Sequence, residues 1–183
     1  MQKVYETKRL LLLPADQSLA KMVVDYYCRN RNFFEPFDPQ READFFTADY
    51  QRRLLLQDEE NRERGVGFRF YLVRREEPDQ IIGMVALNNV VWGSFCSCFL
   101  GYKLDKDWLR RGLMSEAVNE CVRIAFEELG LHRIEANIMP RNTASLGVVR
   151  RCGFAEEGLA RKYLKINGVW EDHLHMVKLN EDE

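Results

Sequence analysis

Three β-rich runs follow one another in the middle of the chain, and this feature constrains the fold more than any other. The runs cover residues 68–73, 81–91 and 95–104. Only short turn-forming segments separate them, residues 77–79 with Pro78 and residues 92–94 with Gly93. Connections this short join antiparallel neighbours, because a parallel pair needs a long crossover. The pattern therefore predicts an antiparallel meander and disfavours a doubly wound parallel sheet.

Helices are predicted on both sides of this meander. A first strand over residues 9–13 ends at Pro14, and Asp16 and Ser18 then offer N-caps for a helix to about residue 30. Residues 32–39, with two prolines and three aromatics, are predicted to form an ordered loop, and a heavily charged helix is predicted over residues 41–64. After the meander, apolar residues recur at helical spacing over residues 113–129, and Gly130 can end that helix.

The last third of the chain adds a strand over residues 134–139 and a short helix that Asn142 caps and Gly153 ends. Two further strands, 154–166 and 169–179, are joined by Asn167-Gly168, which is the strongest short signal for a β-hairpin. With no linker or repeat, residues 1–183 are interpreted as one domain. The class is α/β, more narrowly α+β, because helices and strands do not alternate regularly.

Composition excludes several functional classes. The 27 Lys and Arg residues nearly balance the 29 Asp and Glu residues, which disfavours direct recognition of nucleic acid. No apolar run approaches the ~20 residues that span a bilayer, so no membrane association is expected. The five cysteines are an odd number without a CxxC pair, which favours free thiols and a cytoplasmic location.

The segment that joins the third β-rich run to the 113–129 helix is the most informative about function. The first amides of a helix lack intrahelical partners and can bind an anion. Gly112 allows a phosphate to approach the backbone, and Arg110 and Arg111 add positive charge. On this feature alone, an ordinary helix start with solvated arginines is the simpler interpretation. No P-loop and no GxGxxG motif offers a competing phosphate site.

Residues 110–117 resemble motif A of the GCN5-related N-acetyltransferases (GNAT), Gln/Arg-x-x-Gly-x-Gly/Ala. Residues 142–154 resemble the same family's Asn-x-x-Ser…Gly-Phe segment, and the strand that begins His132-Arg-Ile-Glu-Ala136 has the family's usual form. Further segments are similar to the RimJ-type ribosomal-protein-alanine acetyltransferases, so that the resemblance covers nearly the whole chain: Lys8-Arg-Leu10, residues 89–95, Leu100-Gly-Tyr102, Glu157-Gly158 and residues 163–173.

This resemblance implies a mixed, mostly antiparallel twisted sheet of six to seven strands with about four helices. The sheet would be splayed between the fourth and fifth strands, which flank the 113–129 helix. The implied activity is transfer of an acetyl group from acetyl-CoA to the N-terminal alanine or serine of a ribosomal protein, free or on the ribosome. The amine would attack the thioester directly, and no metal is needed.

The resemblance also implies which residues contact acetyl-CoA. Its diphosphate would rest on the backbone of residues 109–114, its pantetheine would lie along the end of the 95–104 strand, and Asn142 would contact the pantetheine arm. The implied contacts are Tyr102, Leu104, Leu109, Arg110, Arg111, Gly112, Leu113, Met114, Asn142 and Ser145. Two positions depart from motif A, because Leu109 replaces Gln or Arg and Met114 replaces Gly or Ala.

Three residues are catalytic candidates. The resemblance places Ser145 near the sulfur, where its hydroxyl could protonate the departing thiolate, and Tyr163 is the alternative acid. Each also has a structural interpretation, Ser145 as a helix-start hydroxyl and Tyr163 as a half-buried strand aromatic. The 95–104 strand contains no glutamate that could act as the base. Glu135, on the next strand, could act through water, although a solvent-facing role is commoner.

The absence of an obvious base favours an α-amine as the acceptor. An α-amine has a pKa of about 7.7–8.0 and a lysine about 10.4. Near neutral pH about a quarter of α-amines are uncharged, against about one lysine in a thousand. The difference corresponds to roughly 3.5 kcal/mol, so the sequence favours a protein N-terminus over a lysine.

The residues predicted to bind the acceptor come from loops and the last hairpin: Phe33, Phe34, Phe37, Asn89, Trp170 and Asp172. Asp172 could pair with an incoming ammonium. Alternatively, Phe33 and Phe37 pack on the sheet and Asp172 is an ordinary surface residue.

Two other functions remain open: acetylation of a small amine such as a polyamine or antibiotic, and a non-catalytic CoA-binding module. A zinc site built from Cys96, Cys98, His173 and His175 lacks supporting turn spacing and is set aside.

Overall fold

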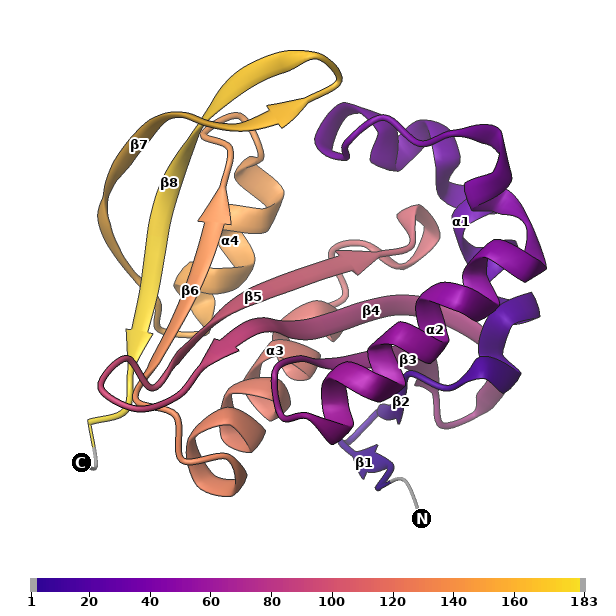
Figure 1. Ribbon diagram of the computed structural model, residues 1–183, viewed down its shortest axis with the longest axis horizontal. Coiled ribbons are helices and arrows are strands. Elements are labelled where there is room, and N and C mark those ends of the chain that lie inside the picture. The colour runs from indigo at the N-terminus through magenta and orange to yellow at the C-terminus, as the bar shows by residue number, and fades with distance from the viewer. Residues whose placement is uncertain (1–2, 182–183) are drawn as a thin grey trace.

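One eight-stranded sheet forms the centre of the molecule in the computed structural model, which describes residues 3–181 (Figure 1). The strand order is β1-β2-β3-β4-β5-β6-β8-β7. The strands are β1 (Tyr5–Glu6), β2 (Leu10–Pro14), β3 (Phe68–Arg74), β4 (Glu77–Val91), β5 (Ser97–Leu104), β6 (Arg133–Ile138), β7 (Ala155–Ile166) and β8 (Val169–Leu179). All neighbours are antiparallel except β5 and β6. The predicted mostly antiparallel sheet is confirmed.

Four α-helices cover the sheet: α1 (Ala20–Phe34), α2 (Ala48–Glu63), α3 (Leu113–Arg123) and α4 (Thr143–Arg151). Apolar side chains that alternate along the strands divide the core in two. Leu72, Val85, Leu100 and Ile134 belong to the cluster that includes residues of α3 and α4. Tyr71, Met84 and Ala86 belong to the cluster that includes residues of α1 and α2. The period-2 alternation therefore assigns each strand residue to one of the two faces.

Four sequence predictions need correction. β1 makes eight strands rather than six to seven, because two residues are too short to show alternation. Helix α1 continues to Phe34 and is followed by a 3₁₀ turn over Glu35–Phe37, where a loop was expected. The charged helix begins only at Ala48, after a 3₁₀ turn over Ala43–Phe46. The β3–β4 turn lies at residues 75–76 instead of 77–79.

The sheet is splayed between β5 and β6, as the family resemblance implies. These two strands pair only over Ser97–Phe99 and Arg133–Glu135. Beyond Phe99 the strands diverge: β5 runs toward α1, and β6 runs beside β8 (Figure 1). From there to Leu104 the edge of β5 that faces β6 has no partner strand in the described part of the chain.

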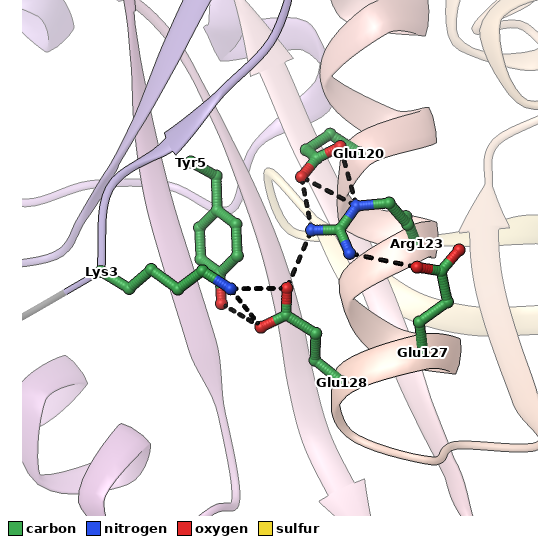
Figure 2. Close-up of polar contacts among 6 residues, drawn as sticks. All are labelled: Lys3, Tyr5, Glu120, Arg123, Glu127 and Glu128. Atoms are coloured by element: carbon green, nitrogen blue, oxygen red, sulfur yellow. Dashed lines mark hydrogen bonds and ion pairs between the residues drawn. The ribbon is translucent and has the colours of Figure 1, made fainter.

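A network of charged side chains attaches the start of the described chain to the end of α3 and to the π-helical turn that follows it, Ile124–Glu128 (Figure 2). Glu128 accepts hydrogen bonds from Lys3 at 2.8 Å, from Tyr5 at 2.9 Å and from Arg123 at 2.9 Å. Arg123 also contacts Glu120 and Glu127. The network holds β1 against the helix that begins at the predicted anion site.

Among residues 3–181, none of the helices has the length and apolar character that crossing a membrane requires.

Candidate active site

Asp105 organises the turn between β5 and α3. Its side chain is 1 % exposed, accepts a hydrogen bond from the Asp107 amide at 3.0 Å, and pairs with Arg29 at 2.6 Å. Burial alone raises the pKa of Asp105, but the hydrogen bonds from Asp107, Asn30 and Arg29 outweigh it and hold the pKa below its usual value. A charged carboxylate therefore fixes the 3₁₀ turn Lys106–Trp108 just before the helix.

The backbone then presents free amides to solvent. Arg110 has φ 60° and Gly112 has φ 73°, so both lie in the left-handed region. The first intrahelical hydrogen bond runs from the Glu116 amide to the Gly112 carbonyl at 3.1 Å. Within the described residues, the amides of residues 112–115 have no protein acceptor. Leu113 and Met114 are each 4 % exposed and pack in the core, so their side chains are not available to a ligand.

Arginine side chains surround these amides. Arg9 donates to the Arg111 carbonyl at 2.8 Å and pairs with Glu116 at 2.7 Å. The guanidinium groups of Arg111 and Arg74 stack on the Trp108 ring, at 4.5 Å and 4.3 Å from its centroid. Free helix amides combined with this positive charge form a site suited to a diphosphate. These amides and arginines lie in the predicted phosphate turn, whose role in binding stays a prediction, and Leu109 and Arg110 are exposed beside them.

Ser145 lies at the start of α4 and contacts β5. Its hydroxyl donates to the Tyr102 hydroxyl at 2.7 Å, and Tyr102 donates to the Ser145 carbonyl at 2.8 Å. Burial raises the pKa of Tyr102, so its hydroxyl stays protonated. Asn142 caps α4 by accepting from the Ser145 amide at 3.2 Å. Sequence analysis predicted Tyr102 and Leu104 only as backbone groups, and it did not predict this side-chain pair.

Glu135 and Tyr163 come together on the sheet face away from α3 and α4. Glu135 pairs with Arg133 at 2.8 Å and lies 3.7 Å from His175 Nδ1. The Tyr163 ring packs edge-on against His175, with ring centroids 5.1 Å apart, and its hydroxyl accepts from Asn137 at 3.2 Å. Tyr163 and Ser145 thus belong to separate groups of contacting residues.

The segment after α1 bridges the two diverging strands, and we call residues 35–38 the strap. Lys103 of β5 forms an ion pair with Asp38 at one end of the strap. Arg141, which follows β6, donates to the Pro36 carbonyl at 2.9 Å, and Asn167 donates to the Glu35 carbonyl at 2.6 Å. Figure 1 shows the β7–β8 turn beside this segment. The strap closes one end of the face on which Glu135 lies.

The predicted acceptor residues are divided among several places. Phe34 is 8 % exposed and packs on Tyr26 in the core, whereas Phe33 is half-exposed. Phe37 lies in the strap, 5.3 Å from the Arg141 guanidinium.

Three acceptor candidates lie outside the strap. Trp170 is 57 % exposed on β8, and Asp172 accepts a hydrogen bond from the Lys162 amide at 2.8 Å. Asn89 lines a separate hollow beside α2.

Sequence reasoning missed three residues of this region: Lys103, Asn137 and Arg141. Strand alternation could have placed Lys103 and Asn137 on the face that carries Glu135, because Leu104 and Ala136 next to them are apolar. Nothing in the sequence indicated the contact between Arg141 and the strap. Within residues 3–181, no group of three His, Cys, Asp or Glu side chains is placed to share a metal ion.

Comparison with known proteins gives a consistent result. A family model described as an acetyltransferase (GNAT) domain matches residues 9–155. The probable N-acetyltransferase YjcK of Bacillus subtilis is 40 % identical over 96 % of this chain and 97 % of its own length. The [ribosomal protein uS5]-alanine N-acetyltransferase of Escherichia coli is 38 % identical over 92 % of this chain and 86 % of its own length.

A solved structure agrees with these relatives. The ribosomal-protein-S5-alanine acetyltransferase of Vibrio fischeri superposes with a TM-score of 0.93 and 36 % identity, and the match covers 98 % of each chain.

Proposed function

The chain belongs to the GNAT acetyltransferases and is an acyltransferase, and we propose that it transfers the acetyl group of acetyl-CoA to the N-terminal alanine or serine of a ribosomal protein. One observation carries this proposal. The identity with the uS5-alanine acetyltransferase extends over 92 % of the chain, so it includes the strands and helices on the acceptor side as well as the phosphate turn.

The phosphate turn fits the donor. The free amides of residues 112–115 would hold the diphosphate, with Arg111 and Arg9 offsetting its charge. The unpaired edge of β5 beyond Phe99 would bind the pantetheine through backbone hydrogen bonds, in the way that the edge of a sheet binds an added strand. Tyr102 and Leu104 lie on this edge. Leu109 and Met114, which depart from motif A, do not obstruct the site, because the contacts there are made by the backbone.

Ser145 is the proposed acid. Its hydroxyl lies beside the unpaired edge of β5 and is held there by Tyr102. As the amine nitrogen bonds to the acetyl carbon and the thioester C–S bond breaks, the Ser145 hydroxyl would protonate the departing thiolate, and the Tyr102 hydroxyl would return a proton to Ser145. The proton that the amine loses would pass through water and restore Tyr102. Asn142 is a positioning residue in this scheme, because its side chain caps the helix that carries Ser145.

The acceptor amine would approach from the face that carries Glu135. Glu135 is paired with Arg133, and its carboxylate would accept a hydrogen bond from a water molecule beside the amine. An α-amine suits such a site, because about a quarter of it is uncharged near neutral pH. Tyr163 would line this face with Asn137 and His175 and is not the acid in this scheme.

The test is a comparison of acceptors at a fixed acetyl-CoA concentration. Peptides that begin with alanine or serine, the same peptides with a blocked N-terminus and an internal lysine, and spermidine would each be supplied. Thiol release measures turnover, and mass spectrometry locates the added acetyl group. We expect rapid acetylation of the free α-amine only. Preference for spermidine would indicate a small-amine enzyme, and CoA binding without turnover on any amine would indicate a binding module.

A further inference from the structure

We infer that a hollow beside α2 binds an uncharged polar side chain of the acceptor polypeptide, three or four residues after the amine that is acetylated. The inference rests on the proposed function, since it needs a polypeptide acceptor. The hollow measures about 160 Å³ and lies between the second half of α2 and the adjoining ends of β3 and β4. This is smaller than the ~300 Å³ or more of a typical small-molecule site, and it suits one side chain.

The lining of the hollow is polar and electrically balanced. Asp58 of α2 lies 3.1 Å from Arg69 of β3, so their charges offset each other. The contact is made by the buried Arg69 Nε atom, so this donor is already engaged in the ion pair. Asn88 is half-buried and Asn89 is exposed, and among residues 3–181 neither side-chain amide is hydrogen-bonded to another protein group, so both can contact a guest. Side-chain amides that can donate to and accept from a guest, beside a neutral ion pair, favour an uncharged polar guest such as a carboxamide or an imidazole.

The backbone at Asn89 supports a binding role. Asn89 has φ 50°, in the left-handed region, and lies where the β4–β5 register shifts between Asn88 and Val91. Asparagine adopts this conformation more readily than most residues, because its short polar side chain can hydrogen-bond locally. The shift places two successive asparagines at the rim of one hollow.

The hollow lies within reach of the reacting amine. Asn88 pairs with Phe99, and Phe99 pairs with Glu135 at the last position before the sheet splays. Adjacent strands are about 4.8 Å apart, so β4 lies about 10 Å from β6. An extended chain advances about 3.3 Å per residue, so its third or fourth residue reaches the hollow when its first residue lies at the splay. Asn88 and Glu135 also share the face opposite α3 and α4, because Leu87 and Ala136 next to them pack in the α3/α4 cluster.

Two variants remove lining groups without a new clash. Asn89→Gly deletes one amide and suits φ 50°, so it is expected to fold at least as well as the wild type. Asn88→Ala deletes the other amide. The matched control is Cys96→Gly, which also replaces a left-handed residue (φ 40°) by glycine but lies outside the hollow.

The experiment compares alaninamide, which has the α-amine but no following residues, with hexapeptides that begin with alanine. Asparagine or leucine is placed in turn at positions two to five, and kcat/KM is measured for each acceptor. We expect the wild type to prefer asparagine to leucine about tenfold at position three or four only. The ratio to compare is kcat/KM for the preferred peptide divided by kcat/KM for alaninamide. Asn89→Gly and Asn88→Ala should each lower this ratio by about tenfold, and Cys96→Gly should leave it unchanged.

The inference would be overturned if the wild type acetylated all peptides efficiently with no positional preference. It would also be overturned if the two asparagine variants kept the wild-type ratio. Either result would leave the proposed function standing. A wild type that acetylates neither alaninamide nor any peptide would overturn the proposed function, and this inference with it.

Discussion

The hydroxyl of Ser145 donates a hydrogen bond to the hydroxyl of Tyr102 over 2.7 Å, and this contact joins α4 to β5 across the splay in the sheet. Tyr102 returns a hydrogen bond to the Ser145 carbonyl at 2.8 Å. The pair therefore forms a closed loop in which each hydroxyl has a defined partner. A proton donor whose rotamer is fixed beside the unpaired edge of β5 is the arrangement that thioester cleavage needs.

Ser145→Ala is predicted to lower kcat about 100-fold, because positioned acids contribute about 10²–10⁴ in rate. Tyr102→Phe should lower kcat less, by about tenfold, since it keeps the Ser145 hydroxyl but removes the hydroxyl that orients it. Steady-state kinetics with an alanine peptide gives both values, and calorimetry with CoA should show nearly unchanged affinity in both variants. An unaltered kcat in Ser145→Ala would remove Ser145 from the mechanism.

Gly112→Ala is predicted to weaken CoA binding at least tenfold. The residue has φ 73°, where a side chain costs about 1–2 kcal/mol, and relief of this strain would move the amides of the phosphate turn. Gly130→Ala is the matched control, since Gly130 has φ 64° but lies past the far end of α3. Both variants should lose similar thermal stability, and only Gly112→Ala should lose CoA affinity. Equal affinities in the two variants would contradict the assigned phosphate turn.

Glu128→Gln tests the charged network of Figure 2. Hydrogen bonds from Lys3 and then Arg123 lower the pKa of Glu128 to about 2. Because the pKa is depressed in the folded protein, the stabilisation is present above the unfolded value near 4.3 and is lost as the pH falls toward 2. The difference in unfolding free energy between wild type and variant should be constant from pH 6 to 7 and should shrink toward zero near pH 2. Urea titrations across this range measure it, and a pH-independent difference would contradict the network's role.

The cysteines are predicted to differ in reactivity. Burial, together with the charge of Glu135, raises the pKa of Cys98 to about 12, and burial also raises the pKa of Cys121 and Cys152. Cys28 is exposed. Iodoacetamide at pH 8 should therefore modify Cys28 in the native protein and spare the three buried thiols, as peptide mass spectrometry would show. If Cys98 were labelled as fast as Cys28, the buried position of Cys98 on β5 would be contradicted.

Local chemistry accounts for the parts of the fold that the sequence predicts well. Asn167 and Gly168 form the predicted hairpin turn because both adopt positive φ, 47° and 83°, which a type I′ turn requires. The start of α3 directly after Gly112 could be predicted, because a glycine and the first apolar residues at helical spacing are adjacent in the chain. β1 was not predicted, because a strand of two residues is too short to show the alternation of apolar and polar side chains.

Long-range contacts account for what the sequence did not predict. The strap depends on the hydrogen bond from Asn167 to Glu35, which are 132 positions apart. The Ser145–Tyr102 pair spans 43 positions, and neither residue type specifies the other. Phe34, predicted to bind the acceptor, is 8 % exposed because α1 continues through it and turns the ring into the core. No local propensity distinguishes these outcomes.

The central claim is that the amides at the start of α3 bind the diphosphate of acetyl-CoA. Titration of ¹⁵N-labelled protein with acetyl-CoA, followed by amide NMR, tests it directly. We predict that the largest shifts occur at residues 112–115 and that inorganic pyrophosphate reproduces them in part. Saturable binding of acetyl-CoA that leaves these four amides unshifted would contradict the account.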